Sequence, residues 1–108
     1  MDHKAAKALL HIKTWLDRVN EITQRGERAY FEDDLLQEAG DSLMMKLGEA
    51  ANRLSKLDVL APEGVVWAEA VANRNYLIHQ YDDIDRRITW VSLTDEKPCV
   101  KPPAFRRF

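Results

Sequence analysis

The longest amphipathic pattern lies in the middle of the chain, and it limits the possible fold more than any other feature. Its apolar residues recur at the spacing of one helix face: Leu36, Ala39, Leu43, Met44, Leu47, Ala50, Ala51, Leu54 and Leu57. The pattern predicts an amphipathic helix of roughly 25 residues. Gly40 and Gly48 inside it cost about 1 kcal/mol each relative to Ala. Such a cost usually has a packing reason, so we expect another backbone to approach this helix closely.

A second periodic segment precedes this one and predicts a helix over residues 3–24. Its apolar positions follow the same spacing: Leu9, Ile12, Trp15, Leu16, Val19 and then Ile22 or Thr23. The sequence QRGE ends the segment at Gly26. The chain therefore opens with two amphipathic helices in succession.

Two shorter helices are expected after the breaker LAPEG at residues 60–64. The third helix is indicated by residues 65–78, VVWAEAVANRNYLI. The segment DDID that follows offers Asp82 or Asp83 as the N-cap of a fourth helix over residues 84–93. That helix is expected to bury Ile88, Trp90 and Val91. No stretch alternates like a strand for long. The sequence predicts an all-α protein, an up-and-down four-helix bundle with a face left for a second copy.

Composition fits one globular domain. At 108 residues, with 45% hydrophobic and 31% charged residues, the chain suits a helical domain over residues 1–96 and a proline-containing tail over residues 97–108. No window approaches the roughly 18 apolar residues needed to span a bilayer, and the N-terminus is too charged for a signal peptide, so a cytoplasmic protein is expected. Cys99 has no metal-site spacing. The net charge of −2 neither supports nor excludes nucleic acid.

The segment RNYLIHQY, residues 74–81, gathers side chains suited to catalysis. On a continuous helix Arg74 and His79, five residues apart, would lie about 140° from one another around the axis. We expect the third helix to stop near Ile78 instead. His79, Gln80 and Tyr81 would then form a turn that folds back toward Arg74.

These residue types suit metal-independent cleavage of RNA. That reaction needs a base for the ribose 2′-hydroxyl, an acid for the leaving 5′-oxygen, and positive charge on the phosphorane. His79 can serve as either base or acid near neutral pH, and Arg74 presents a fork that matches phosphate oxygens. A mechanism with two histidines would need the same segment of a second protomer. Arg86 and Arg87 are either solvated or extend a phosphate-binding surface.

Structural interpretations of the same residues stand beside the catalytic one. A lone His at a helix end is more often a cap or a packing group than a catalyst. Glu49 and Asn52 are either solvated or orient Arg74 or His79. By spacing alone, Tyr76 and Tyr81 are half-buried packing residues, while His3 and His11 are surface residues.

R-N-Y-L-I-H-Q-Y-D-D-I-D resembles the R-x-x-x-x-H-x-Y signature of HEPN-domain ribonuclease toxins of the HepT type. Upstream, YFEDDLLQEA and KLGEAANRLSKL are similar to the long second helix of that family, including its G-E-A element at Gly48 to Ala50. The resemblance covers most of residues 9–96. Gln80 stands where the family usually has glycine, and the sequence departs from the family pattern after about residue 96.

The resemblance implies an all-helical homodimer that acts as a metal-independent endoribonuclease toxin, needs no cofactor of its own, and cuts transfer RNA or messenger RNA. Arg74 and His79 match the catalytic pair, and Asn75 matches the polar residue that often follows the arginine. Tyr81 matches the tyrosine to which the partner, a minimal nucleotidyltransferase antitoxin, transfers AMP from ATP.

Two other functions remain open at this point. The first is a non-catalytic HEPN-like subunit that binds and regulates a nucleotidyltransferase. The second is a helical dimer with a structural role only.

Overall fold

The computed structural model describes residues 3–62, 65–80 and 82–94, and within them all regular structure is helical. The helices are α1 (His3–Gln24), α2 (Glu27–Glu32), α3 (Asp34–Lys56), α4 (Trp67–His79) and α5 (Arg86–Thr94). The prediction of an all-helical bundle is confirmed. Four of these helices correspond to the expected ones, while the short α2 was not expected. The predicted tail, with Cys99, lies outside the described residues.

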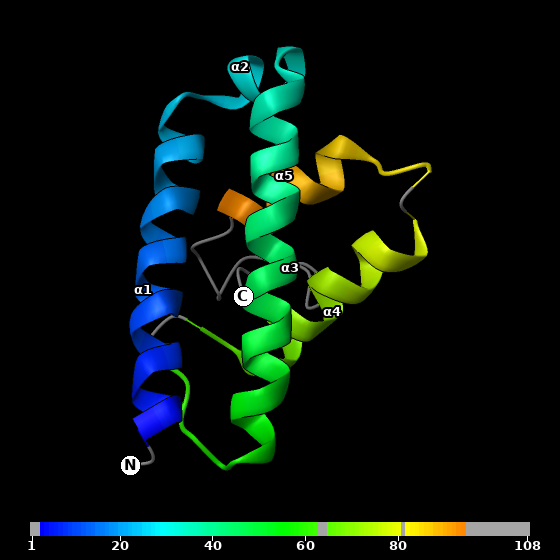
Figure 1. Ribbon diagram of the computed structural model, residues 1–108. Helices are drawn as coiled ribbons and strands as arrows, with labels where there is room; N and C mark the ends of the chain where they lie inside the picture. The colour runs from blue at the N-terminus through cyan, green and yellow to red at the C-terminus, as the bar shows by residue number, and fades with distance from the viewer. Residues whose placement is uncertain (1–2, 63–64, 81, 95–108) are drawn as a thin grey trace.

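The two long helices, α1 and α3, run side by side in opposite directions, with α2 at the turn between them (Figure 1). Gly26 has φ 95°, a conformation that L side chains rarely adopt, and it separates α1 from α2. The Asp33 carboxylate accepts a hydrogen bond from the Leu35 N–H at 2.9 Å and so caps α3. The observed α1 covers the predicted residues 3–24.

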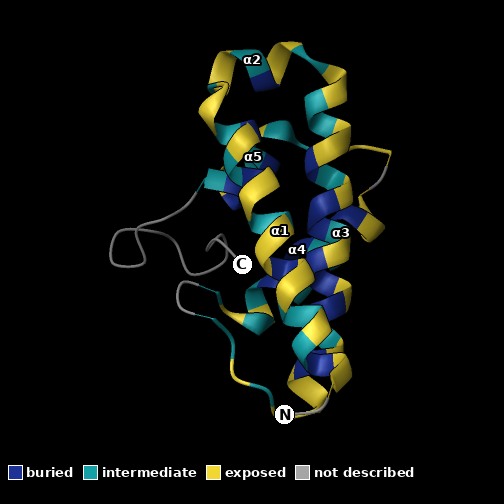
Figure 2. Ribbon diagram, turned by 60° about the vertical axis from the view of Figure 1, so that its left-hand side comes forward, coloured by how far each residue is buried: buried dark blue, intermediate teal, exposed yellow. Residues whose placement is uncertain are grey.

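The core lies between α1 and α3, with contributions from the other three helices, and Figure 2 shows its residues on the inner sides of the ribbons. Its largest members are fully buried: Ile12, Val19, Tyr30, Met44, Leu47, Leu54 and Leu93. α4 lies beside α3, and α5 crosses behind it in Figure 1. The sequence periodicity therefore predicted most of the buried face of both long helices, but Ala39 and Leu57, which it also placed on that face, are exposed.

Gly48 has the packing reason expected of both glycines of α3, the close approach of another backbone, whereas Gly40 faces side chains. A Cβ on Gly48 would overlap the Cβ of Arg74 and stand 2.9 Å from the carbonyl oxygen of Ala70, so α4 crosses α3 in close contact there. A Cβ on Gly40 would meet the Leu93 side chain at 3.1 Å. The two glycines thus allow α4 and α5 to approach α3.

The end of α4 and the start of α5 differ from the prediction. α4 continues through His79, and the Gln80 N–H bonds to the carbonyl oxygen of Tyr76 at 3.0 Å. Neither Asp82 nor Asp83 caps α5, because Asp85 does so, accepting from the Arg87 N–H at 2.9 Å.

The predicted buried face of α5 was also wrong. Thr89, Ser92 and Leu93 are buried, whereas Ile88 and Trp90 are half-buried and Val91 is exposed. The polar members of this face have internal partners, which apolar periodicity does not reveal. Ser92 Oγ bonds to Asn73 at 3.2 Å.

Among the residues that the structure describes, no helix is both long enough and apolar enough to cross a lipid bilayer.

Candidate active site

Arg74 is held where α4 crosses α3. Its Nη1 donates to Glu49 Oε1 at 2.9 Å, and its Nη2 donates to Asn75 Oδ1 at 3.0 Å. The Arg74 side chain is only 16% exposed, so these two partners fix its guanidinium rather than leaving it mobile in solvent. The close contact of its Cβ with Gly48 fixes the base of the side chain. Both ends of Arg74 are therefore positioned by α3 and α4.

Of the two possibilities left open for Glu49, the structure shows contact with Arg74. Glu49 is itself 59% exposed, so its carboxylate lies at the protein surface beside a mostly buried guanidinium. Asn52 is half-buried, and within residues 3–62 and 65–80 no hydrogen bond joins its side chain to Arg74 or His79. A competing anion can therefore displace the exposed Glu49 carboxylate and pair with the Arg74 guanidinium.

His79 is the last residue of α4, and it is exposed. The prediction that it sits in a turn folded back toward Arg74 was wrong, because α4 continues one residue further than expected. Five helical residues separate the two side chains by about 140° around the axis and about 7.5 Å along it. No hydrogen bond joins them among the described residues. Within one chain, the arginine and the histidine therefore face different directions.

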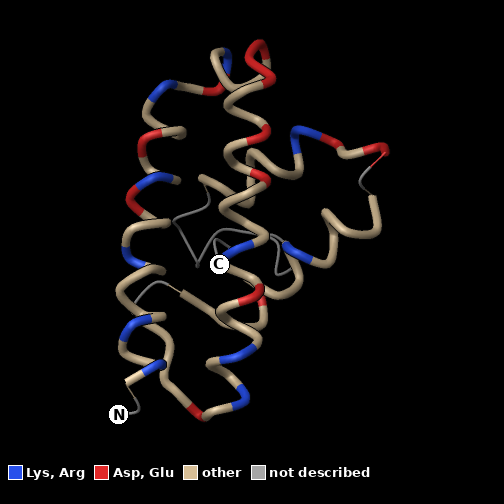
Figure 3. The backbone as a smooth tube through the Cα atoms, viewed as in Figure 1, with Lys and Arg blue, Asp and Glu red and all other residues tan. Residues whose placement is uncertain are grey.

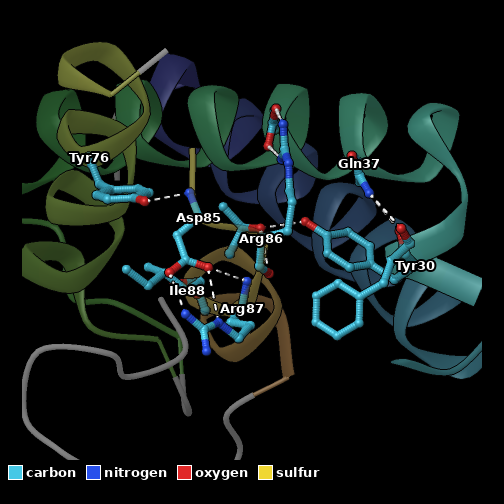
Figure 4. A network of polar contacts seen from close by, with 11 residues as sticks. Tyr30, Gln37, Tyr76, Asp85, Arg86, Arg87 and Ile88 are labelled. Atoms are coloured by element: carbon cyan, nitrogen blue, oxygen red, sulfur yellow. Dashed lines mark hydrogen bonds and ion pairs between the residues drawn. The ribbon is translucent and has the colours of Figure 1, made fainter. Parts of the chain in front are cut away.

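The segment between α4 and α5 is held at its end by a tyrosine. Tyr76 is half-buried, as expected, and its hydroxyl accepts from the backbone N–H of Asp85 at 2.9 Å. Figure 4 shows this bond and the Asp85 carboxylate turned toward Arg87. Tyr81, the tyrosine singled out in the motif, lies outside the described residues.

Arg86 is not a solvated residue. Its guanidinium makes two hydrogen bonds to the Asp41 carboxylate, at 2.7 and 3.0 Å, and both side chains are about a quarter exposed. The bond to Asp41 raises the pKa of Arg86. Arg87, in contrast, is 84% exposed and pairs with Asp85 at 3.3 Å. A phosphate contact by either arginine stays a prediction, and Arg86 would first have to leave Asp41.

A buried tyrosine lies beside this ion pair. Tyr30 bonds through its hydroxyl to Thr89 Oγ1 at 2.6 Å, and burial raises its pKa (Figure 4). These contacts attach α5 to α2 and α3 (Figure 4). Sequence reasoning did not find this network, because Asp41 and Thr89 carry no motif and lie far apart in the chain.

No group of three His, Cys, Asp or Glu side chains within the described residues could hold a metal ion. The charged groups that the structure brings together are instead ion pairs, above all those of Arg74 and Arg86.

Comparison with known proteins gives one match. The model of a family described as Ribonuclease HepT-like matches residues 12–104, which include most of α1 and all of the later helices. No curated protein and no solved structure matches the chain.

Proposed function

The chain belongs to the Ribonuclease HepT-like family, and from this we propose that it is an endoribonuclease whose reaction centre contains Arg74 and His79. The family description supports ribonuclease activity. The observation that carries the assignment to Arg74 is its position: a mostly buried guanidinium held by Glu49 and Asn75 at the α3–α4 crossing.

In the proposed reaction the 2′-oxygen of a ribose attacks the adjacent phosphorus. The new O–P bond forms as the bond from phosphorus to the 5′-oxygen breaks. His79 removes the 2′-proton or supplies a proton to the 5′-oxygen, and Arg74 stabilises the negative charge of the phosphorane. The phosphate would displace Glu49 from Arg74, exchanging one oxyanion partner for another. Asn75 would keep the guanidinium in place during that exchange.

A second copy of the chain would complete the site. One chain supplies one histidine in this segment, and the reaction uses both an acid and a base. His79 is exposed and faces away from Arg74, and its neighbour Ile78 is 46% exposed although apolar. A symmetric homodimer in contact at the end of α4 would cover Ile78 and bring two His79 side chains to one cleft.

The same site would be regulated by modification of Tyr81. In this proposal a minimal nucleotidyltransferase antitoxin transfers AMP from ATP to the tyrosine hydroxyl. The tyrosine oxygen bonds to the α-phosphorus as the bond to the β-phosphate breaks, pyrophosphate leaves with the hydroxyl proton taken up by solvent, and this chain, the toxin, is silenced. The added phosphate would compete for Arg74, and the nucleotide would block the path of the RNA.

The test is cleavage of total cellular RNA by purified protein in EDTA. Arg74→Ala and His79→Ala should each lower the cleavage rate by about 100-fold or more, while circular dichroism shows the parental helix content. His3→Ala and Arg28→Ala are matched controls, since both residues are exposed and far along the chain from the motif. Parental cleavage rates in the His79 or Arg74 variant would refute the site. An inactive parent that still binds a nucleotidyltransferase would favour the non-catalytic regulatory subunit.

A further inference from the structure

Two hollows lie along one face of the α1–α3 pair, one toward each end. The first, of about 480 Å³, lies between the start of α1 and the end of α3, and its cations are Lys4, Lys7 and Arg53. The second, of about 300 Å³, lies between the end of α1 and the start of α3, and its cations are Arg18, Arg25 and Lys46. We call the surface that contains both hollows the α1–α3 face.

The cations of the two hollows lie on the same side of their helices. The cations of α1 and of the residues just beyond it follow a seven-residue spacing at Lys4, Arg18 and Arg25, and Lys7 lies one turn from Lys4. Residues seven apart drift by only about 20° around a helix. Lys46 and Arg53 are seven apart on α3 as well. The two hollows are therefore parts of one basic stripe.

Positive charge is concentrated on this face. Its hollows have one carboxylate in their lining, that of Glu21, which pairs with Arg18 at 2.9 Å. The five other Lys and Arg side chains are exposed, and none of them makes an ion pair with another described residue. The chain as a whole has more acidic than basic residues. In Figure 3 the lower half of α1 shows Lys and no Asp or Glu, while its upper half shows charges of both signs. Such a face attracts a polyanion.

The α1–α3 face also offers two rings, His11 in the lining of the first hollow and Trp15 one helical turn further along α1. His11, which is exposed, lies 5.7 Å from the half-buried Trp15, measured between ring centroids. Apolar side chains line the hollows on either side, among them Leu54 and Leu43. Cations along a backbone with rings for bases to stack on are the pattern of single-stranded nucleic acid sites.

The face continues into the candidate active site. Lys46 and Arg53 stand three residues before and four residues after Glu49, so all three are neighbours on the surface of α3. Glu49 in turn pairs with Arg74 at 2.9 Å. We infer that the α1–α3 face binds the single-stranded RNA substrate on one side of the cut. The inference rests on the proposed function for the identity of the polyanion.

The probe for the test is a single-stranded 2′-O-methyl RNA of about 12 nucleotides, which has no 2′-hydroxyl and so is not cut. Its binding is followed by fluorescence anisotropy over a range of salt concentrations. Lys7→Gln with Arg53→Gln should weaken binding about 10- to 30-fold and lower the salt slope by about 1.4, or about 0.7 for each phosphate contact. The matched control is Lys13→Gln with Arg28→Gln, two exposed cations outside the hollows.

The outcomes separate this inference from the proposed function. The inference is overturned if the Lys7 and Arg53 double variant binds RNA with the same affinity and salt slope as the control. It is also overturned if the parent does not bind the probe, even if the parent cuts ordinary RNA. A change of oligomeric state with unchanged RNA binding would also overturn it and would make the face an interface between copies. Salt-dependent binding that Lys7 and Arg53 govern, by a parent that cuts no RNA, would support binding of single-stranded RNA at the α1–α3 face and refute the proposed function.

Discussion

At the scale of single residues, Gly48 has the more restrictive surroundings of the two glycines in α3. A Cβ there would meet the backbone oxygen of Ala70 and the base of Arg74, neither of which can move without moving α4. At Gly40 the nearest atom is the far end of the Leu93 side chain, which can adjust. The position of Arg74 thus depends on a residue that has no side chain of its own.

Gly48→Ala should therefore destabilise the protein by about 1–3 kcal/mol through overpacking and slow RNA cleavage by displacing Arg74. Gly40→Ala is the matched variant. Its milder contact is opposed by a gain of about 1 kcal/mol in helix propensity, so its stability should stay near that of the parent. Urea denaturation of both variants measures the difference. Equal free energies of unfolding would mean that α4 can move away from α3 at little cost.

At the scale of helices, the Asp41–Arg86 ion pair fastens the start of α5 to α3. Asp41→Ala removes two charge-assisted hydrogen bonds and leaves a partly buried guanidinium without its partner. We expect a loss of about 2 kcal/mol in the free energy of unfolding. Asp17→Ala, at an exposed position of α1, should change it by less than about 0.5 kcal/mol. Denaturation curves that coincide for the two variants would show that the pair contributes nothing to docking α5.

The cap of α5 should make stability depend on pH. The hydrogen bond from the Arg87 side chain lowers the pKa of the Asp85 carboxyl below its usual value. The folded state therefore binds this proton more weakly than the unfolded chain, so the stabilisation is present at neutral pH and is lost as the pH falls through the folded-state pKa. Asp85→Asn keeps an oxygen for the cap but removes the charge. The parent should be more stable than the variant at pH 7, with the gap closing below about pH 4. Urea denaturation at pH 7 and below about pH 4 measures the difference in free energy of unfolding between parent and variant. An equal difference at the two pH values would contradict the prediction.

The same region shows where sequence reasoning ends. Apolar periodicity predicted the extent of α1, because a helix buried along one face leaves its period in the sequence. The start of α5 was missed because DDID contains three acids that could each cap a helix, and the bond from Asp85 N–H to Tyr76 is a tertiary contact. The Asp41–Arg86 pair joins two helices that only the folded chain brings together. Local sequence patterns therefore predicted four of the five described helices and the motif, whereas the side-chain partners between helices are set by how the helices pack.

At the scale of the whole molecule, one chain separates the two groups that the proposed reaction needs together. Arg74 is anchored against α3, whereas His79 is exposed at the end of α4. In the proposed mechanism a second copy of the chain supplies the other acid or base. The proposed dimer therefore predicts that the two subunits act as a unit.

Mixing the parent with His79→Ala tests that prediction directly. If each cleft uses one His79 as base and the partner's as acid, only dimers of two parental chains cut RNA. An equal mixture, unfolded and refolded together so that subunits pair at random, should retain about a quarter of the activity of the same total amount of parent. If each chain acts alone, it should retain about half. Refolding the parent with His3→Ala, which should be active, controls for losses in the procedure. A value near one half would exclude the two-histidine cleft. His79 would then be either the acid or the base, and another group, such as water, would take the other role.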